Sequence, residues 1–272
     1  RDGLRMTVSA GGNVGERLMA VGARNYGAIR GEALDWLIEM KRFDQALQFD
    51  ELARAGRLTP DLLERTADVI AAAHGALAPV ATAGHAADYR GIIRELRETE
   101  EEGAAKSGLH IADPELFDAL DAELAHVDPL IERRRRDGKV RRGHGDLHLR
   151  NMCLFDGAPT LFDALEFDER LATTDVLYDL AFLLMDLDHR GHRRLANLAF
   201  NRYMAVTGDV GGLACLPLFL SLRAAVRAHV GAAAANTQSD KAQSALQADE
   251  ARRYLEAALA YLDPLPPRAV AV

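Results

Sequence analysis

Residues 173–191, TTDVLYDLAFLLMDLDHRG, set the strongest condition on the fold of this chain. A helix drawn through the segment is apolar on almost every side, and such a helix has to be surrounded by other parts of the protein. Thr174 or Asp175 is placed to cap its first turn, and Gly191 marks its end. We therefore predict a central buried helix.

Other segments have the periodicity of amphipathic helices. In TPDLLERTADVIAAAHGAL, Thr59 is a suitable N-cap and Pro60 occupies the first helical position. We predict further helices over 85–105, 114–136, 193–206, 213–236 and 241–262. Pro129 is expected to kink or break the helix in which it lies.

Strands are predicted in three places. The apolar run Leu34–Met40 is typical of one buried strand. NMCLF and PTLFDAL are short β-type runs separated by DGA, and the Asp156-Gly157 pair favours a tight hairpin turn. Residues 1–33 are rich in glycine, and we expect loops there with one or two strands.

Length and composition exclude several classes of protein. A chain of 272 residues makes one large domain or two small ones. A net charge of −8 argues against a nucleic-acid partner. No uninterrupted apolar stretch has the ~20 residues of a membrane helix, and the first residues lack a secretory signal, so a cytoplasmic protein is the default expectation. The start at Arg1 suggests a fragment whose natural beginning lies upstream.

A polar stretch, HGDLHLRN, lies directly before the predicted hairpin at residues 144–151. Asp146 and Asn151 are five residues apart, and the antiparallel return should bring Asp163 beside Asn151. Two carboxylates and an amide oxygen are hard ligands that suit Mg²⁺. Phosphoryl transfer needs this set, with one carboxylate to take a hydroxyl proton and the other two groups to hold the metal on the phosphates.

Three motifs, HGDLHLRN, LFDALEFD and DVLYDLAFLLMDL, together resemble the aminoglycoside phosphotransferase family of the protein-kinase-like superfamily. They are most similar to its uncharacterised bacterial members, some of which carry this region before a P-loop ATPase domain. The resemblance covers roughly residues 34–230. It implies an α+β, protein-kinase-like fold with an incomplete N-terminal β-lobe and hinge over 1–43 and a helical C-terminal catalytic lobe over 44–272.

The resemblance also implies roles for individual residues. Asp146 matches the catalytic base, and Asn151 and Asp163 match the two Mg²⁺ ligands. His144 and Asp179 match residues that support the loop. The hinge backbone that would bind the adenine of ATP matches Glu39, Met40 and Lys41. Apart from the resemblance, the candidate contacts on the substrate side are His148, Arg150, Glu166, Arg223 and Arg227, of which Arg223 and Arg227 share one helix face and could bind an anionic group.

The chain departs from the family's pattern in its first residues. The strand lysine and its glutamate partner, which hold ATP phosphates in the family, are not recognisable, because Lys41 follows the hinge strand. GGNVGE at 11–16 lacks the spacing of a glycine-rich phosphate loop. Elsewhere, His74 is expected in the core, and ERRRRDGKVRR is expected to be a solvated helix end.

The motifs predict an ATP- and Mg²⁺-dependent phosphotransferase that acts on a hydroxyl group of a small molecule. Two alternatives stay open. One is a non-catalytic, kinase-like binding module that lacks a complete nucleotide lobe, and the other is a metal-dependent hydrolase that uses His144, Asp146 and His148. The acceptor is not fixed by the family, because related members phosphorylate many hydroxyl compounds.

Overall fold

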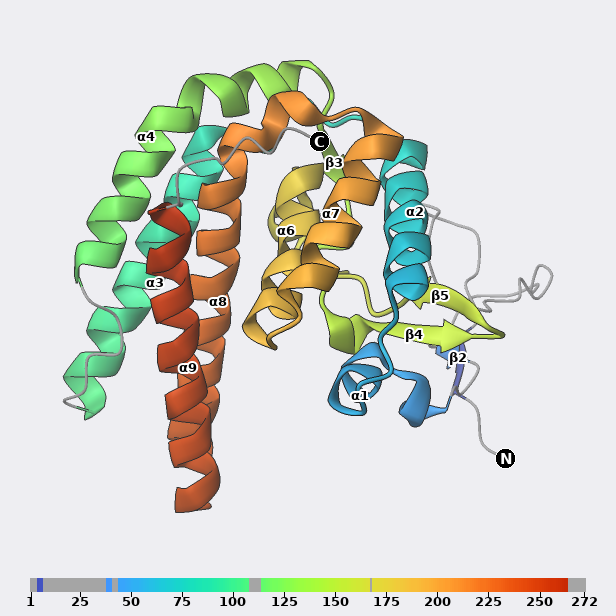
Figure 1. The fold of residues 1–272 in the computed structure, drawn as a ribbon. Coiled ribbons are helices and arrows are strands. Elements are labelled where there is room, and N and C mark those ends of the chain that lie inside the picture. The colour runs from blue at the N-terminus through green and yellow to red at the C-terminus, as the bar shows by residue number, and fades with distance from the viewer. Residues whose placement is uncertain (1–3, 7–37, 41–43, 108–113, 167, 264–272) are drawn as a thin grey trace, which may run out of the picture.

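The computed structural model describes residues 4–6, 38–40, 44–107, 114–166 and 168–263. Helices account for most of them, and strands β4 and β5 lie beside α1 and α2 at one side of the molecule (Figure 1). The α-helices are α1 (Phe49–Arg54), α2 (Pro60–Ala76), α3 (Ala86–Ser107), α4 (Pro114–Arg136), α5 (Glu169–Ala172), α6 (Val176–His189), α7 (Arg193–Thr207), α8 (Leu216–Thr237) and α9 (Lys241–Leu262). Short 3-10 turns are η1 (Gln45–Leu47), η2 (Leu149–Asn151) and η3 (Val210–Cys215).

Helix α6 is the centre of the core, as its sequence predicts. Every residue from Val176 to Leu187 is buried. The helix packs between α7 on one side and α8 on the other (Figure 1). Asp175 caps it, because its side chain accepts a hydrogen bond from the Leu177 amide at 2.8 Å.

The other predicted helices are present with small shifts at their ends. Thr59 caps α2 through a 3.2 Å hydrogen bond from the Leu62 amide, and Pro60 is the first helical residue. The expected break at Pro129 does not occur, since α4 is continuous through it. A proline removes one backbone hydrogen bond, and the buried side chains on either side of it, Val127 and Ile131, hold the helix in the core.

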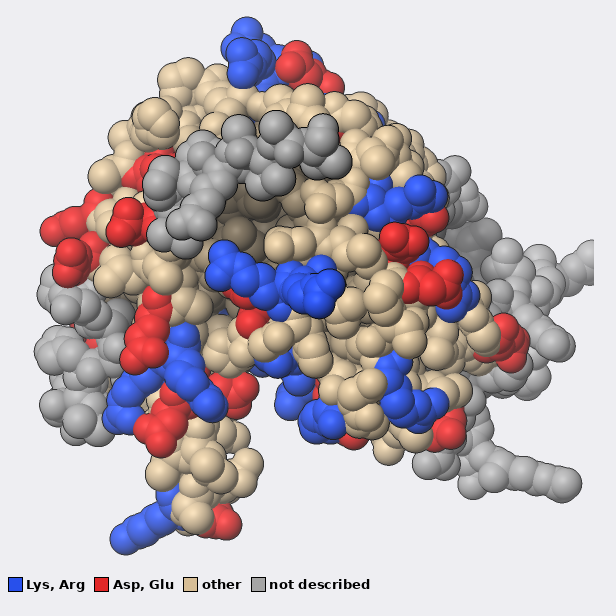
Figure 2. Space-filling model, in the orientation of Figure 1, with Lys and Arg blue, Asp and Glu red and all other residues tan. Residues whose placement is uncertain are grey.

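Helices α8 and α9 form a long antiparallel hairpin that extends beyond the rest of the molecule (Figure 1). The segment Val210–Thr237 is long and apolar enough to cross a membrane, and its most apolar window has a mean hydropathy of 1.4. Half of its most apolar window is buried against the protein itself, and the core helix of a soluble protein meets the same criterion. In the space-filling view, the free end of the hairpin stands apart from the side that carries α1, leaving a hollow between them (Figure 2).

The strands are β1 (Leu4–Met6), β2 (Ile38–Met40), β3 (Val140–Arg142), β4 (Met152–Phe155), β5 (Ala158–Leu161) and β6 (Thr173–Asp175). They pair antiparallel as β1–β2, β3–β6 and β4–β5. The β4–β5 turn has positive φ at both Asp156 (49°) and Gly157 (78°), which is the tight hairpin turn that an Asp-Gly pair favours. Of the predicted strand Leu34–Met40, the described part is β2.

The basic segment at the end of α4 is not wholly solvated, so that expectation was wrong for Arg134. This side chain is 3% exposed. Its guanidinium donates two hydrogen bonds each to Asp175 and Asp209, at 2.7–2.8 Å. The two buried carboxylates compensate the buried charge, and the resulting bridge fixes the end of α4 to the start of α6.

Candidate active site

The HGDLHLRN loop connects β3 to β4. Val140 pairs with Asp175 and Arg142 pairs with Thr173, so the loop leaves the short β3–β6 sheet at its Thr173 end, where Asp179 from the first turn of α6 binds its first amides. It ends in η2, whose last residue, Asn151, directly precedes β4. The polar side chains of the loop are therefore held between α6 and the β4–β5 hairpin.

Asp179 anchors the start of the loop from within α6. Its carboxylate accepts the amide of His144 at 2.8 Å and that of Gly145 at 2.9 Å. Burial raises its pKa, but the hydrogen bond from His74 (3.2 Å) and nearby positive charge outweigh burial and hold the pKa below its usual range. A Cβ at Gly143 would come within 2.5 Å of the Asp179 carboxylate, so the turn requires glycine there.

His144 ties the loop to the far end of the hairpin. Its ring is 2% exposed, and Nε2 donates to the Phe162 carbonyl at 2.9 Å. Burial lowers the pKa of His144, so the ring is neutral at pH 7. The amide of Phe162 in turn donates to the Asn151 carbonyl at 3.0 Å. These two bonds to Phe162 fix the backbone position of the next residue, Asp163.

Asp146, His148 and Asn151 form a hydrogen-bonded cluster. Nδ1 of His148 accepts the Arg150 amide at 3.2 Å, so the proton of the neutral ring is on Nε2, which lies 3.3 Å from Asp146 Oδ2. The same oxygen accepts Nδ2 of Asn151 at 2.8 Å. Burial raises the pKa of Asp146, but the bonds from His148 and Asn151 outweigh it and lower the pKa overall. Asp146 is thus an ionised carboxylate with 39% of its side chain exposed.

Asn151 and Asp163 supply oxygen atoms that fit a hard cation. The NH₂ group of Asn151 donates to both the backbone carbonyl and the carboxylate of Asp146. The amide oxygen of Asn151 therefore faces away from Asp146. Asp163 is exposed, adopts a left-handed φ of 58°, and has no hydrogen-bond or ion-pair partner among the described residues. A carboxylate and an amide oxygen beside a phosphate group are a donor set that suits Mg²⁺, which keeps several waters.

The loop does not have the arrangement of a transition-metal site. In the described part of the chain, no three His, Cys, Asp or Glu side chains converge as metal ligands. His144 uses Nε2 for the Phe162 carbonyl, and His148 uses Nδ1 for the Arg150 amide. The histidines of the hydrolase alternative are therefore engaged in holding the loop.

The predicted substrate-side residues lie in different places. His148 belongs to the Asp146 cluster and packs edge-on against Phe182. Arg150 is exposed, with Nε 3.5 Å from the buried Asp50 of α1. Glu166 is exposed beyond the hairpin, and its charge acts on Arg142.

The two arginines of α8 have different neighbours, and only Arg223 is fully buried. Arg223 is 5% exposed and donates to backbone carbonyls beneath the loop, so a substrate cannot reach it. Arg227 lies over the ring of Tyr254 in α9, 5.8 Å from its centroid. The prediction of a substrate contact is therefore wrong for Arg223, and for Arg227, which is partly exposed, it stays a prediction.

The predicted adenine-binding residues are only partly described. Glu39 and Met40 belong to β2, where Met40 pairs with Leu4. Lys41 lies outside the described residues. Their role toward a nucleotide stays a prediction.

Sequence reasoning missed Asp186, which anchors the end of the loop. It is 3% exposed, and its Oδ2 accepts the Leu149 amide at 3.0 Å. Its Oδ1 accepts Nε of Arg190 at 2.8 Å. A carboxylate in an apolar helix needs partners, and this reasoning applies to Asp186 as it does to Asp179 two turns earlier.

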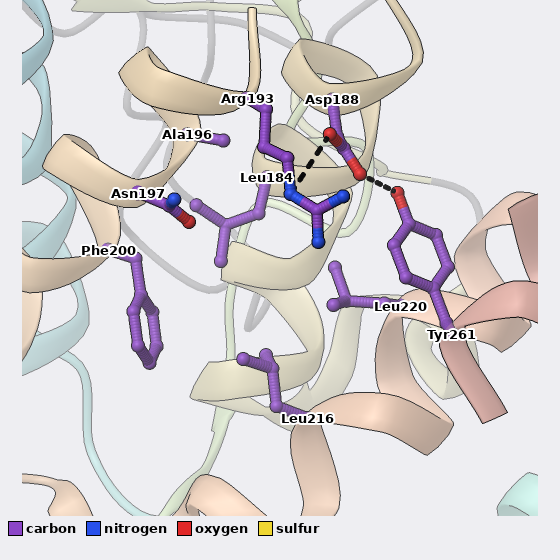
Figure 3. A pocket seen from close by; sticks show the side chains of 9 residues that line it. All are labelled: Leu184, Asp188, Arg193, Ala196, Asn197, Phe200, Leu216, Leu220 and Tyr261. Carbon is purple, nitrogen blue, oxygen red and sulfur yellow. Dashed lines mark hydrogen bonds and ion pairs between the residues drawn. The ribbon is translucent and has the colours of Figure 1, made fainter. Parts of the chain in front are cut away.

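A separate cavity of about 160 Å³ lies on the opposite face of α6 (Figure 3). Leu184 and Asp188 line it, together with side chains of α7, α8 and Tyr261 of α9. The Tyr261 hydroxyl donates to Asp188 at 2.8 Å, and Arg193 lies 3.9 Å from the same carboxylate. None of the residues that line this cavity belongs to the HGDLHLRN loop, so it is not the site built around Asp146.

Residues 28–214 match the model of the phosphotransferase enzyme family. An uncharacterised protein of Mycobacterium tuberculosis (strain H37Rv) is 27% identical over 202 residues, which are 71% of this chain and 40% of the relative. The chain thus spans about 40% of the length of that relative. A putative phosphonates utilization ATP-binding protein of Escherichia coli K12 is 68% identical over 40 residues, 15% of this chain and 16% of that protein.

Two solved kinases have a similar fold. A choline kinase of Cryptosporidium parvum aligns with a TM-score of 0.54 and 13% identity, covering 87% of this chain and 72% of the kinase. An ethanolamine kinase of Plasmodium vivax aligns with a TM-score of 0.52 and 14% identity, covering 85% and 68%. The likeness confirms the α+β, kinase-like fold that the motifs predicted.

Proposed function

Because the chain belongs to the phosphotransferase enzyme family, we propose that it transfers the γ-phosphoryl group of ATP to a hydroxyl group of a small molecule. The observation that carries the proposal is the Asp146 cluster, in which a partly exposed, ionised carboxylate shares a hydrogen bond with Asn151. This pairing joins the group that would accept a proton to a group that would hold the metal.

In the proposed reaction, Asp146 accepts a hydrogen bond from the acceptor hydroxyl and orients its oxygen toward the γ-phosphorus. The new O–P bond forms as the bond to the β-phosphate oxygen breaks, ADP leaves, and the hydroxyl proton passes to Asp146. Such a transition state is loose, with little proton transfer until late, so an aligned and ionised carboxylate matters more than a strongly basic one. The lowered pKa of Asp146 suits that role.

Asn151 and Asp163 would hold Mg²⁺. When bound, this ion neutralises charge on the transferring phosphoryl group. The chain's own contribution is to fix the two oxygens: Asn151 through its bonds to Asp146, and Asp163 through the bonds that Phe162 makes to Asn151 and His144.

The arrangement of the whole chain in this proposal follows the sequence prediction. Residues 1–43 would contribute the incomplete N-terminal lobe and the hinge, and residues 44–272 the helical lobe that carries the site. We place the reaction in the cytoplasm, where ATP is available.

The proposal is tested by incubating the protein with Mg²⁺, ATP and a panel of amino alcohols, amino sugars and neutral sugars, and by following ADP release and new phosphate esters by ³¹P NMR. We expect ester formation with at least one acceptor class. Asp146→Asn should lower kcat by about 10²- to 10⁴-fold, the usual contribution of a positioned base.

Asp156→Asn is the matched control, because it makes the same chemical change at the tip of the adjacent hairpin, where asparagine also tolerates the left-handed φ. It should retain wild-type turnover. Wild-type turnover by Asp146→Asn would contradict the proposal, and a folded wild-type protein that does not bind Mg·ATP would favour the non-catalytic module, which lacks a complete nucleotide lobe.

A further inference from the structure

Arg223 of α8 is a buried cation whose position the core alone does not explain. Its side chain is 5% exposed, yet the nearest carboxylate oxygen, Asp179 Oδ1, is 3.9 Å from its NH2. That NH2 is buried without a hydrogen-bond partner in the described part of the chain. Burying a charge with an open donor is costly. A packed apolar side chain would have served the core better.

The donors of Arg223 are directed at the backbone on either side of the site. Nε donates to the Tyr178 carbonyl of α6 at 3.1 Å, and NH1 donates to the Gly145 carbonyl of the loop at 3.1 Å. The guanidinium lies 3.9 Å from the ring centroid of Tyr178 and 4.8 Å from that of Phe182. Phe182 in turn packs against His148. The guanidinium therefore fills the space beneath the loop.

The bond to Gly145 acts on the peptide unit that leads into Asp146. The Gly145 carbonyl and the Asp146 amide belong to one planar peptide group. A hydrogen bond that fixes the carbonyl therefore also fixes the orientation of the Asp146 backbone amide. Gly145 has a φ of 78° and no side chain to restrain it. A Cβ there would come within 2.9 Å of Leu165 and 3.2 Å of Ala172, so a larger residue cannot supply the restraint.

Asp179 and Arg223 together hold both backbone polar groups of Gly145. Asp179 holds the amide of Gly145, which belongs to the preceding peptide unit, and Arg223 holds its carbonyl, which belongs to the following one. We propose that Arg223 is a positioning residue that holds the Gly145–Asp146 peptide in the orientation from which Asp146 meets the acceptor hydroxyl. This inference rests on the proposed function, because it assigns Arg223 a part in the same reaction.

The experiment compares Arg223→Met and Arg223→Lys with the wild type. Arg223→Met should lower kcat by about 10²-fold, the cost of a misplaced reacting group. The KM for Mg·ATP should stay within about threefold, because the backbone hydrogen bonds from Asn151 to His148 and from Phe162 to Asn151 do not involve Gly145 or Asp146. Arg223→Lys keeps a charge and a donor and should recover part of kcat. A residue that only supports the core would lower thermal stability and leave kcat of the folded protein unchanged.

Arg97→Met is the matched control. Arg97 of α3 also lies over an aromatic ring, Phe117, and pairs with Asp121, but it is remote from the loop. It should lose stability without losing kcat. If Arg223→Met does not fold, the Arg223→Lys effect is measured again in the Asp146→Asn background, where it should disappear. Equal effects in both backgrounds would overturn the inference, as would a folded Arg223→Met variant with kcat within twofold of the wild type.

A second readout keeps this test separate from the proposed function. The His148 amide donates to the Asp146 carbonyl at 3.0 Å, so its hydrogen exchange reports the orientation of the Asp146 backbone without turnover. It should exchange faster in Arg223→Lys than in the wild type and in Arg97→Met. Unchanged exchange would overturn the positioning role even if the protein phosphorylates an acceptor, whereas absent transfer in the wild type would overturn only the proposed reaction.

Discussion

Asp146 is kept ionised by two neighbours that donate to the same oxygen, Oδ2. One of them, Asn151, is also a proposed metal ligand, so its removal would change two properties at once. His148 acts on the carboxylate alone, from a ring that packs on Phe182. The pKa of Asp146 can therefore be tested separately through His148.

We predict that His148→Phe raises the pKa of Asp146, because it keeps an aromatic ring on Phe182 and removes the Nε2 donor. Asp146 must be ionised to accept the hydroxyl proton, and its activity is lost as the pH falls through its pKa. The acidic limb of the kcat/KM profile should therefore move to higher pH. The measurement is this profile at saturating Mg²⁺.

His148→Gln is the control, because glutamine retains an N–H donor, and its profile should lie closer to that of the wild type. A His148→Phe profile that coincides with the wild-type profile would mean that His148 does not influence Asp146.

The site could be predicted from sequence to the extent that its residues are close along the chain. Asp146 and Asn151 are five residues apart in one loop, and the hairpin signal placed Asp163 beside them. The role of Arg223 could not be predicted from the sequence, because its partner Gly145 is 78 residues away. Two arginines on one helix face give the same sequence pattern whether that face is exposed or buried. Burial, which the sequence did not show, decides between the two.

At the scale of elements, helix α6 holds the loop at both ends. Asp179 binds its first amides, and Asp186, two turns later on the same face, binds the amide of Leu149 in η2. Because η2 ends at Asn151, the second anchor should act mainly on the proposed metal site.

We predict that Asp186→Asn raises the KM for Mg·ATP by about tenfold, the effect of losing a residue that orients a metal ligand, with a smaller change in kcat. Steady-state kinetics over a range of Mg²⁺ concentrations measure it. Asp188→Asn, on the opposite face of α6, should leave the KM unchanged. Equal KM values for the wild type and Asp186→Asn would contradict a coupling between α6 and the metal site.

Elements with local signals were predicted well, and elements that depend on distant partners were not. Thr59 with Pro60 and the Asp156-Gly157 turn carry their information within a few residues. The three-residue strands β3 and β6 are too short to show a period, and they pair across 33 residues. Arg134 was predicted to be solvated because its carboxylate partners are 41 and 75 residues away along the chain and give no local signal.

The whole molecule should lose stability as the medium becomes acidic, and His144 contributes to the first part of this loss. Its pKa is lowered by burial, so the folded protein keeps the ring neutral while the unfolded chain binds a proton near the ordinary value of 6.5. Where the unfolded state binds more protons, the free energy of unfolding falls as the pH falls. The lowered pKa of Asp179 adds a further loss, which sets in as the pH falls through its ordinary value of 3.8, where the unfolded chain takes up the proton and the folded protein does not.

We predict that the free energy of unfolding in urea decreases between pH 7 and pH 5.5, and that His144→Gln makes this decrease smaller. Glutamine can donate to the Phe162 carbonyl as His144 does, but it does not titrate. Urea unfolding followed by circular dichroism at several pH values measures the slope. Equal slopes for both proteins would show that His144 is not buried as a neutral ring.

The central claim is that Asn151 and Asp163 hold Mg²⁺ on the phosphates of ATP beside Asp146, and calorimetric titration of the protein with ATP tests it most directly. We expect ATP to bind with Mg²⁺ present and to lose most of its affinity when Mg²⁺ is removed. Asp163→Ala should lose the metal-dependent part of the binding, and Asp156→Asn should keep it. ATP binding by the wild type that is independent of Mg²⁺, or equal binding by Asp163→Ala, would contradict the claim.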